Sequence, residues 1–328
     1  WDVMSTKRIM KTFIKGIGDA KIKELESKEV LRSGLRITDF MSTKIFRQEP
    51  YEQLERGLIA KDVVVFDVET TGLDVMTARI IQIAAIRIDE DGNEIAKFEE
   101  FINPGISVGD SERIHHFSDA YLQENGRDAS TVLEEFRQFS DGAVIVGHNV
   151  QYDMSMLEQE CTRHGVQIPR VQAIYDTMDI YRRFYPNLRN HKLITISEMY
   201  AKGFESTHNA MDDVIATGKI LVYAMKENIL PTKAQRMGFV NKYRSYFSGV
   251  ASAMDTLRSK LMHGKPTQVL QYILNDLKIL RFYESLATND AEEDHRIGRL
   301  YDLLKMMTNL EKEHPEYIGR DGIKAVLE

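Results

Sequence analysis

Strand-like patterns are confined to the middle of this chain of 328 residues. Four runs rich in apolar and β-branched residues are typical of buried strands: 63–66 (VVVF), 79–88 (RIIQIAAIRI), 97–102 and 143–146. Apolar residues with helical spacing lie after them, at 130–139, 154–161, 193–200 and 210–225. Strands that first follow one another and then alternate with helices predict an α/β fold, with a mixed sheet and flanking helices.

Both flanks of this segment have helical spacing and almost no strand signal. Helices are expected at 6–14 and 20–31, and helical spacing continues from Thr232 to the end. At roughly 100–200 residues per domain, the length predicts two domains. Each flank is small for a core of its own, and insertions are tolerated at surface loops. We therefore expect an inserted α/β domain at 62–229 and an all-α discontinuous domain formed by 1–61 and 230–328, with connections at 48–61 and 228–231.

Charge is distributed unevenly along the chain, whose formal net charge is −7. Residues 1–61 carry 13 Lys/Arg and 9 Asp/Glu, residues 62–229 carry 15 and 28, and residues 230–328 carry 15 and 13. The middle is thus strongly acidic and both flanks are mildly basic. An acidic segment is either simply well solvated or holds carboxylates that bind cations, and charge alone does not decide between the two.

The single cysteine, Cys161, excludes an intrachain disulfide and a cysteine-rich zinc site. This fits a reducing compartment, so we expect a cytoplasmic protein. No run of 18 apolar residues occurs, so neither a membrane span nor a membrane partner is expected. The sequence opens at Trp1 with no initiator Met and no signal-peptide pattern, which indicates a piece of a longer protein.

The first acidic motif, DVETTGL from Asp67 to Leu73, follows the strand expected at 63–66. Side chains two apart on a strand point to the same face, so Asp67 and Glu69 project together. Two carboxylates in this arrangement repel each other unless a cation or a shared proton lies between them. Gly72 also permits close approach of the backbone to a ligand. The structural alternative is a strand end with two solvated acids.

Two further motifs follow at helix starts. GHNVQYD at 147–153 places Asp153 early in a helix, and HNAMDD at 208–213 places His208 at a helix start and Asp213 in its first turns. Asp212 is about 100° round the helix from Asp213, so only one of them can share a given face. Taken alone, these acids could simply complement helix N-termini, and His208 could be an ordinary surface histidine.

Together the motifs supply four carboxylates and one imidazole. Oxygen-rich sites suit hard cations such as Mg²⁺ or Mn²⁺. Two such ions a few Å apart can hold the attacking and leaving oxygens of an in-line phosphoryl displacement. A histidine that titrates near neutrality is a suitable base for the attacking water. Chemistry of this kind needs no nucleophilic Ser or Cys and no organic cofactor.

On these three motifs, residues 62–229 resemble the DnaQ-like 3′–5′ exonucleases of the DEDD class, histidine subtype, which include proofreading subunits of bacterial replicative polymerases. The resemblance implies a ribonuclease H-like fold and release of 5′-mononucleotides from a 3′ end. It also implies that His208 acts as general base on a metal-bound water. The two divalent ions would be held by four residues: Asp67, Glu69, Asp153 and Asp213.

The same resemblance implies a substrate-binding set. Four consecutive residues would lie against the terminal nucleotide: Thr70, Thr71, Gly72 and Leu73. Arg113-Ile114-His115 matches the I-H-G-I-T site of the family, with His116 in place of its Gly, and His115 and Asn149 are expected to contact substrate. Tyr152 stands where Phe is commoner. Neither departure affects an expected metal ligand.

The flanks are similar to the accessory domain of UvrD-type superfamily 1 DNA helicases, on residues 7–25 (KRIMKTFIKGIGDAKIKEL) and 293–300 (EDHRIGRL). A G-x-G turn before a helix can offer backbone N–H groups to a phosphate, so Lys15, Gly16 and Gly18 are expected to contact DNA. An ordinary helix connection is the alternative. The sequence has no G-x₄-G-K-[ST] motif, so this chain is not the motor itself, and helicase motor domains are expected in the same longer chain.

The sequence thus predicts a DNA 3′–5′ exonuclease within a helicase-related DNA repair protein. The expected partner is a single-stranded 3′ end, with duplex or junction DNA held by the flanks. An RNA exonuclease of the same fold stays open, because nothing in the three motifs reads a 2′-OH. A non-catalytic DNA-binding module also stays open. Loss of a ligand residue would favour it, and none is lost here.

Overall fold

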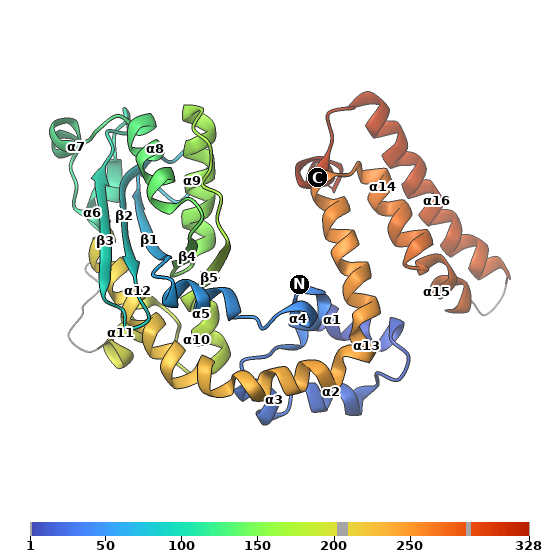
Figure 1. Ribbon diagram of the computed structural model, residues 1–328. Helices are drawn as coiled ribbons and strands as arrows, with labels where there is room; N and C mark the ends of the chain where they lie inside the picture. Colours follow the sequence, from blue (N-terminus) through green and yellow to red (C-terminus); the bar gives the residue numbers. More distant parts are fainter. Residues whose placement is uncertain (1, 202–208, 287–289, 328) are drawn as a thin grey trace. The chain divides into compact units, whose positions relative to one another are not determined.

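The computed structural model describes residues 2–201, 209–286 and 290–327, and the chain divides into two compact units (Figure 1). The sheet unit comprises Glu26–Arg36 and Gln48–Phe239. The helical unit comprises Trp1–Leu25, Ile37–Arg47 and Val240–Glu328. The sheet unit is therefore wider than the 62–229 expected for the inserted domain, because it takes in parts of both flanks.

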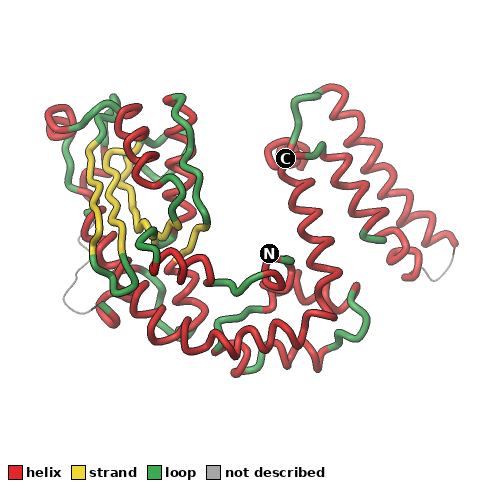
Figure 2. Tube along the Cα trace, in the orientation of Figure 1, coloured by secondary structure: helices red, strands yellow, loops and turns green. Residues whose placement is uncertain are grey.

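Five strands form one mixed sheet in the order β3-β2-β1-β4-β5 (yellow in Figure 2). β1 lies at the centre, antiparallel to β2 and parallel to β4. The strands are β1 (Val63–Thr70), β2 (Ile80–Ile88), β3 (Glu94–Phe101), β4 (Val144–Gly147) and β5 (Ala173–Asp176). The predicted α/β class and mixed sheet are confirmed, and β5 is a strand that the sequence patterns did not indicate.

Helices cover both faces of this sheet (Figure 1). Val64 and Phe66 of β1 pack on one face with residues of α8 and α9, whereas Val63 and Val65 pack on the other with residues of α5, α10, α11 and α12. The helices of the unit are α3 (Lys28–Arg32), α5 (Glu52–Ile59), η2 (Gly109–Ser111), α6 (Glu112–His115), α7 (Asp119–Asn125), α8 (Ala129–Ser140), α9 (Val150–His164), α10 (Thr177–Phe184), α11 (Leu193–Tyr200), α12 (Ala210–Ala224) and the π-helical turn η3 (Met225–Ile229).

The helical unit draws its core from both ends of the chain. The Phe40 ring lies 5.7 Å from the ring of Tyr243 and 5.2 Å from that of Phe247. None of the helices in the described ranges is apolar over the length needed to cross a membrane. The elements are α1 (Val3–Phe13), α2 (Asp19–Leu25), η1 (Ile37–Met41), α4 (Lys44–Arg47), α14 (Pro266–Gln271), the π-helical turn η4 (Tyr272–Asp276), α15 (Ile279–Leu286), α16 (Asp290–Glu313), α17 (Gly319–Leu327) and most of α13 (Leu230–His263).

The single helix predicted at 20–31 is wrong, because the chain breaks between α2 and α3. Ser27 has an extended backbone, and its side chain accepts a hydrogen bond from the amide of Val30 at 3.4 Å. A serine that caps a helix in this way favours a new helix start over continuation of the preceding one. The break also marks the passage from the helical unit to the sheet unit.

The connection predicted at 228–231 is also wrong, because these residues are helical. α12 continues through the π-helical turn η3 into α13, and Pro231 is the second residue of α13. Proline has no N–H for the helical ladder, and here it follows two residues after the end of the π-helical turn η3. The hydroxyl of Thr232 donates to the carbonyl oxygen of Asn228 at 2.6 Å, which satisfies one of the nearby backbone groups.

Arg236 in α13 joins three segments of the sheet unit. Its guanidinium is fully buried and is paired with the carboxylate of Glu49. It donates to the carbonyl oxygen of Ser33 at 2.9 Å and to that of Ile229 at 3.0 Å. It also lies over the ring of Tyr51, 5.0 Å from the centroid. The segments 26–36, 48–51 and 229–236 are therefore held by one cation.

We expect Arg236→Met to destabilise the sheet unit by about 3–5 kcal/mol, because it leaves the Glu49 carboxylate buried without its partner. Native-state hydrogen exchange of β1 amides in the whole chain measures this change. A matched control is Lys233→Met on the same helix. Its partly exposed ion pair with Glu55 is worth about 0–1 kcal/mol. Equal protection in the two variants would contradict the role given to Arg236.

Candidate active site

Four carboxylates converge at the C-terminal end of β1. Asp67 and Glu69 alternate with Phe66 and Val68, so they continue the face of the sheet that α12 covers. Asp153 is buried in the first turn of α9, and Asp213 lies in the first turn of α12. The period-2 alternation of a strand and two helix starts therefore bring together residues that are 146 positions apart in the sequence.

Burial and neighbouring carboxylates raise the pKa values of three of these groups. Burial, followed by the charges of Asp153, Asp213 and Glu69, holds the pKa of Asp67 well above its usual range. Burial and the charges of Asp213 and Asp153 raise the pKa of Glu69 to about 8. Burial raises the pKa of Asp153 to about 7, against the opposing effect of the backbone amides of Asp153 and Val68. Like charges here disfavour ionisation of one another.

The start of α9, which carries Asp153, is held by β5 and α10. Asn149 adopts a left-handed backbone conformation (φ 65°) immediately before α9. Its amide donates to Asp176 Oδ1 at 2.9 Å, and the amide of Met178 donates to the same oxygen at 2.8 Å. His148 contacts Thr177 Oγ1 and the carbonyl oxygen of His191, each at 2.9 Å. These contacts fix the direction in which α9 begins.

The start of α12, which carries Asp213, has a cap of its own. The side chain of Asn209 accepts a hydrogen bond from the amide of Met211 at 3.0 Å. Asparagine is among the preferred N-cap residues. The carbonyl oxygen of Asn209 accepts from the amide of Asp213 at 3.1 Å, which is the first helical bond. His208 lies outside the described residues.

The segment 70–73 leaves β1 as a tightly bonded turn. The hydroxyls of Thr70 and Tyr152 each lie 2.8 Å from the carbonyl oxygen of Gly72 and 2.8 Å from each other. Thr71 is bonded to Arg79 in both directions, through its backbone amide and its hydroxyl, each at 2.9 Å. Leu73 is 87% exposed. Leu73 is thus an exposed apolar side chain four residues after Glu69.

The other expected substrate residues lie in different settings. Asn149 is exposed at the start of α9. His115 is buried, and both its ring nitrogens are engaged locally. Nδ1 accepts from the amide of Phe117 at 3.0 Å, and Nε2 lies 2.9 Å from Ser111 Oγ. Burial lowers the pKa of His115, which favours the neutral ring, and the hydrogen bond from the Phe117 amide requires an unprotonated Nδ1. Contact of either residue with a substrate stays a prediction.

The turn that carries Lys15, Gly16 and Gly18 belongs to the helical unit, between α1 and α2. All three residues are exposed, whereas Ile17 between the glycines is buried. Gly16 has φ +86°, a conformation that L side chains rarely adopt. Because α2 has only seven residues, its N-terminus alone does not make a phosphate site, and DNA contact here stays a prediction.

The carboxylate cluster fits a hard divalent cation in its chemistry. All four groups offer oxygen donors, which Mg²⁺ and Mn²⁺ prefer, and a cation would relieve the repulsion that raises the pKa values of Asp67 and Glu69. Within residues 2–201, 209–286 and 290–327, however, no three acidic, histidine or cysteine side chains are arranged as a metal centre. The four carboxylates thus lie in one region of the sheet unit, but in the described residues no three of them are placed around a single metal position.

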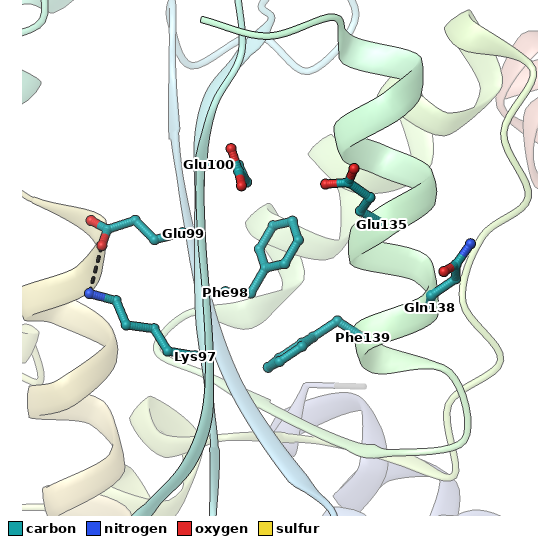
Figure 3. A pocket seen from close by; sticks show the side chains of 7 residues that line it. All are labelled: Lys97, Phe98, Glu99, Glu100, Glu135, Gln138 and Phe139. Carbon is teal, nitrogen blue, oxygen red and sulfur yellow. Dashed lines mark ion pairs between the residues drawn. The ribbon is translucent and has the colours of Figure 1, made fainter. Parts of the chain in front are cut away.

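The sheet unit also has a hollow that none of the four carboxylates lines. Figure 3 shows Phe98 and Phe139 directed into the space between β3 and α8, and the Lys97–Glu99 ion pair on the other side of the strand. Glu100 and Glu135 at the hollow are both paired with Arg127. Its acids are therefore neutralised within the protein, unlike those at the end of β1.

Three residues near the carboxylates were not among the residues selected from the sequence. Asp176 accepts hydrogen bonds from two amides, one at the start of α9 and one at the start of α10. Tyr152 stands out in the sequence only because Phe is commoner at its position. Gln82 of β2 is the cross-strand neighbour of Glu69 and is fully buried. Its Oε1 has no hydrogen-bond partner in the described part of the chain. A polar residue inside the apolar run 80–88 was the available signal for Gln82.

Residues 64–221 match the family model described as Exonuclease, of the RNase T type. The chain is 36% identical over 173 residues to a DNA polymerase III PolC-type of Lacticaseibacillus paracasei, an alignment that covers 52% of this chain and 12% of that protein. It is 29% identical over 240 residues to the PolC-type enzyme of Caldanaerobacter subterraneus, covering 73% and 16%. It thus aligns with about an eighth of the length of the first of these relatives.

Among solved structures, exonuclease I of E. coli in complex with a dT13 oligonucleotide is similar to 56% of this chain and 44% of that one, with 19% identity and a TM-score of 0.46. The described sheet and the family match agree on the same part of the molecule. Residues 64–221 of this chain therefore form an exonuclease domain of the RNase T and DnaQ-like kind, with a ribonuclease H-like fold.

Proposed function

We propose that the sheet unit is a 3′–5′ exonuclease that hydrolyses DNA from its 3′ end and releases 5′-mononucleotides. The observation that carries this proposal is the convergence of Asp67, Glu69, Asp153 and Asp213, because the charges of neighbouring carboxylates in this set contribute to the raised pKa values of Asp67 and Glu69. The match of residues 64–221 to the exonuclease family supports it. An acidic cluster of this kind would bind cations better than it would bind an anionic substrate directly.

The four carboxylates would hold two divalent cations, Mg²⁺ or Mn²⁺. When bound, such ions supply charge neutralisation for the phosphodiester and lower the pKa of water. Asp67 and Glu69 would present their oxygens from the rigid end of a central strand, while the starts of α9 and α12 would direct the other two carboxylates. His208, outside the described residues, would accept the proton from the attacking water.

The turn 70–73 would receive the terminal nucleotide. Leu73 offers an exposed apolar surface on which a base can pack. DNA is the favoured substrate because the relatives that align with this chain bear the name DNA polymerase III PolC-type. RNA remains the second candidate substrate, and the same assay with an RNA strand of identical sequence distinguishes the two.

The helical unit would bind DNA and connect the exonuclease to a larger, helicase-related repair protein. Its K-G-I-G turn leaves Lys15, Gly16 and Gly18 exposed. Lys21 lies beside the rings of Tyr243 and Tyr246, at 5.9 and 5.5 Å from their centroids.

Contacts between lysine side chains and DNA phosphates should weaken steeply with salt. Lys15→Glu should therefore lower both the affinity of the chain for duplex DNA and the salt dependence of that affinity.

We expect Asp67→Asn and Asp213→Asn each to reduce nucleotide release by at least ~10²–10⁴-fold, the range for loss of one catalytic group. The assay uses a 5′-labelled single strand with Mg²⁺, and EDTA should abolish the activity. Asp212→Asn is the matched control, because Asp212 is the adjacent acid about 100° round the same helix. Wild-type turnover in Asp67→Asn, or equal losses in Asp212→Asn and Asp213→Asn, would contradict the assignment.

The polarity of the reaction has its own test. A strand with a 3′-phosphate should be a poor substrate, because its terminal nucleotide no longer fits a site for a free 3′ end. A circular single strand of the same sequence should resist degradation. Cutting of the circle at the rate of the linear strand would instead indicate an endonuclease.

Stability without metal should depend on pH in the direction opposite to that of an ordinary salt-bridged acid. The pKa of Glu69 is about 8, against 4.5 for the ordinary group, so its stabilising contribution is complete below pH 4.5 and lost as pH rises through 8. At pH 9 in EDTA, we expect Glu69→Gln to raise the melting temperature by roughly 2–4 °C, the shift from about 1 kcal/mol in a domain of this size. At pH 4.5 the two proteins should melt alike.

Addition of Mg²⁺ completes this test. The cation should raise the melting temperature of the wild-type protein at pH 8, because ligands that bind only the folded state stabilise it. The rise should be smaller in Glu69→Gln. An equal rise in both proteins would show that the cation binds elsewhere.

A further inference from the structure

The hydroxyl of Tyr152 connects the start of α9 to the turn 70–73. It lies 2.8 Å from the carbonyl oxygen of Gly72 and 2.8 Å from Thr70 Oγ1, which is itself 2.8 Å from the same carbonyl oxygen. These three oxygens form a closed cluster, in which two hydroxyl protons serve three short contacts. Tyr152 directly precedes Asp153, so the cluster joins the second acidic motif to the end of the first.

The rest of the turn is fixed by other groups. The side chain of Asp74 accepts from the amide of Met76 at 3.1 Å and from Thr77 Oγ1 at 3.0 Å. From the far end of α9, Arg163 donates to the carbonyl oxygen of Met76 at 3.0 Å. The segment 74–79 is thus held independently of Tyr152. Among these contacts, those of Tyr152 and Thr70 are the side-chain contacts made to Gly72 itself.

We propose that Tyr152 is a positioning residue that fixes Gly72, and through it Leu73, in the orientation that receives the 3′-terminal nucleotide. The inference rests on the proposed exonuclease function and adds a residue to its substrate site. Gly72 has no side chain, and an added Cβ would meet nothing within 4 Å, so no atom packs against that side of the residue. The hydroxyl cluster restrains Gly72 through its carbonyl oxygen, and the neighbouring Leu73 is 87% exposed.

Tyr152→Phe isolates the contribution of the oxygen. The ring packs against the apolar cluster of α8, α9 and the strands, and Phe keeps that packing. The carboxylates of Asp67, Glu69 and Asp153 are unchanged. Loss of the hydroxyl therefore loosens the turn without removing any group that would hold a cation.

Kinetics on a short single-stranded DNA test the proposal. We expect Tyr152→Phe to raise KM about 5-fold, as loss of one hydrogen bond of ~1 kcal/mol predicts, while kcat stays within 2-fold. Thr70→Val combined with Tyr152→Phe leaves the Gly72 oxygen without either hydroxyl, so KM should rise further. Tyr185→Phe is the matched control, because its hydroxyl donates to Asn228 Oδ1 at 2.8 Å and not to the turn.

Two readouts do not need turnover. Hydrogen exchange at the amides of 71–73 should be faster in Tyr152→Phe than in the wild-type protein and unchanged in Tyr185→Phe. The increase in melting temperature on adding Mg²⁺ should be the same in Tyr152→Phe as in the wild-type protein. A weaker response to Mg²⁺, with a lower kcat, would show that Tyr152 acts through Asp153 and would overturn the proposal.

The outcomes separate this inference from the proposed function. If the wild-type chain releases nucleotides and Tyr152→Phe has the wild-type KM and exchange rates, the positioning role is wrong and the exonuclease assignment stands. If the wild-type chain neither degrades nor binds any single strand, the proposed function fails. Faster exchange at 71–73 in Tyr152→Phe would then still establish the restraint on the turn, without a substrate role.

Discussion

Mutual repulsion among four carboxylates at the end of β1 is the constraint on which the sheet unit depends. In a medium of lower dielectric constant than water, like charges repel more strongly and each loses hydration. Both effects act on Asp67 and Glu69, whose pKa values are raised by burial first and by their acidic neighbours second. The fold attaches two of these acids, Asp67 and Glu69, to its central strand. β1 lies between β2 and β4, and its apolar residues are fully or almost fully buried.

The central strands and the acidic motifs could be predicted because their signals are local. A β-branched run ended by Asp-x-Glu indicates both the strand and the shared face of its acids. β5 has no such signal. It has four residues, it lies at the edge of the sheet, and Ile174 within it is 45% exposed. Its position is set by pairing with β4, which periodicity within residues 173–176 does not reveal.

The predicted boundary of the sheet unit at 228–231 is wrong because it too was placed from local signals. Pro231 indicates a break by local rules, yet the chain continues as a helix through it, directly after a π-helical turn. The buried pair of Arg236 and Glu49 then ties this helix to a segment 187 residues earlier. A contact of that sequence separation depends on the whole fold. The boundary of the sheet unit therefore lies where long-range packing ends, and not where the composition changes.

Hydrogen bonding distinguishes two kinds of polar group in the sheet unit. His115, His148 and Asp176 are engaged by neighbouring residues, so they hold the loops in place. Gln82, beside Glu69 and fully buried, has an oxygen without a partner in the described residues, and such a group costs about 1–3 kcal/mol. The unpartnered oxygen of Gln82 and the repulsion that acts on Asp67 and Glu69 thus lie at the same end of β1. Proteins commonly depart from the rules that buried polar groups are hydrogen-bonded and buried charges are paired at their functional sites. Here the acids and Gln82 depart from them together.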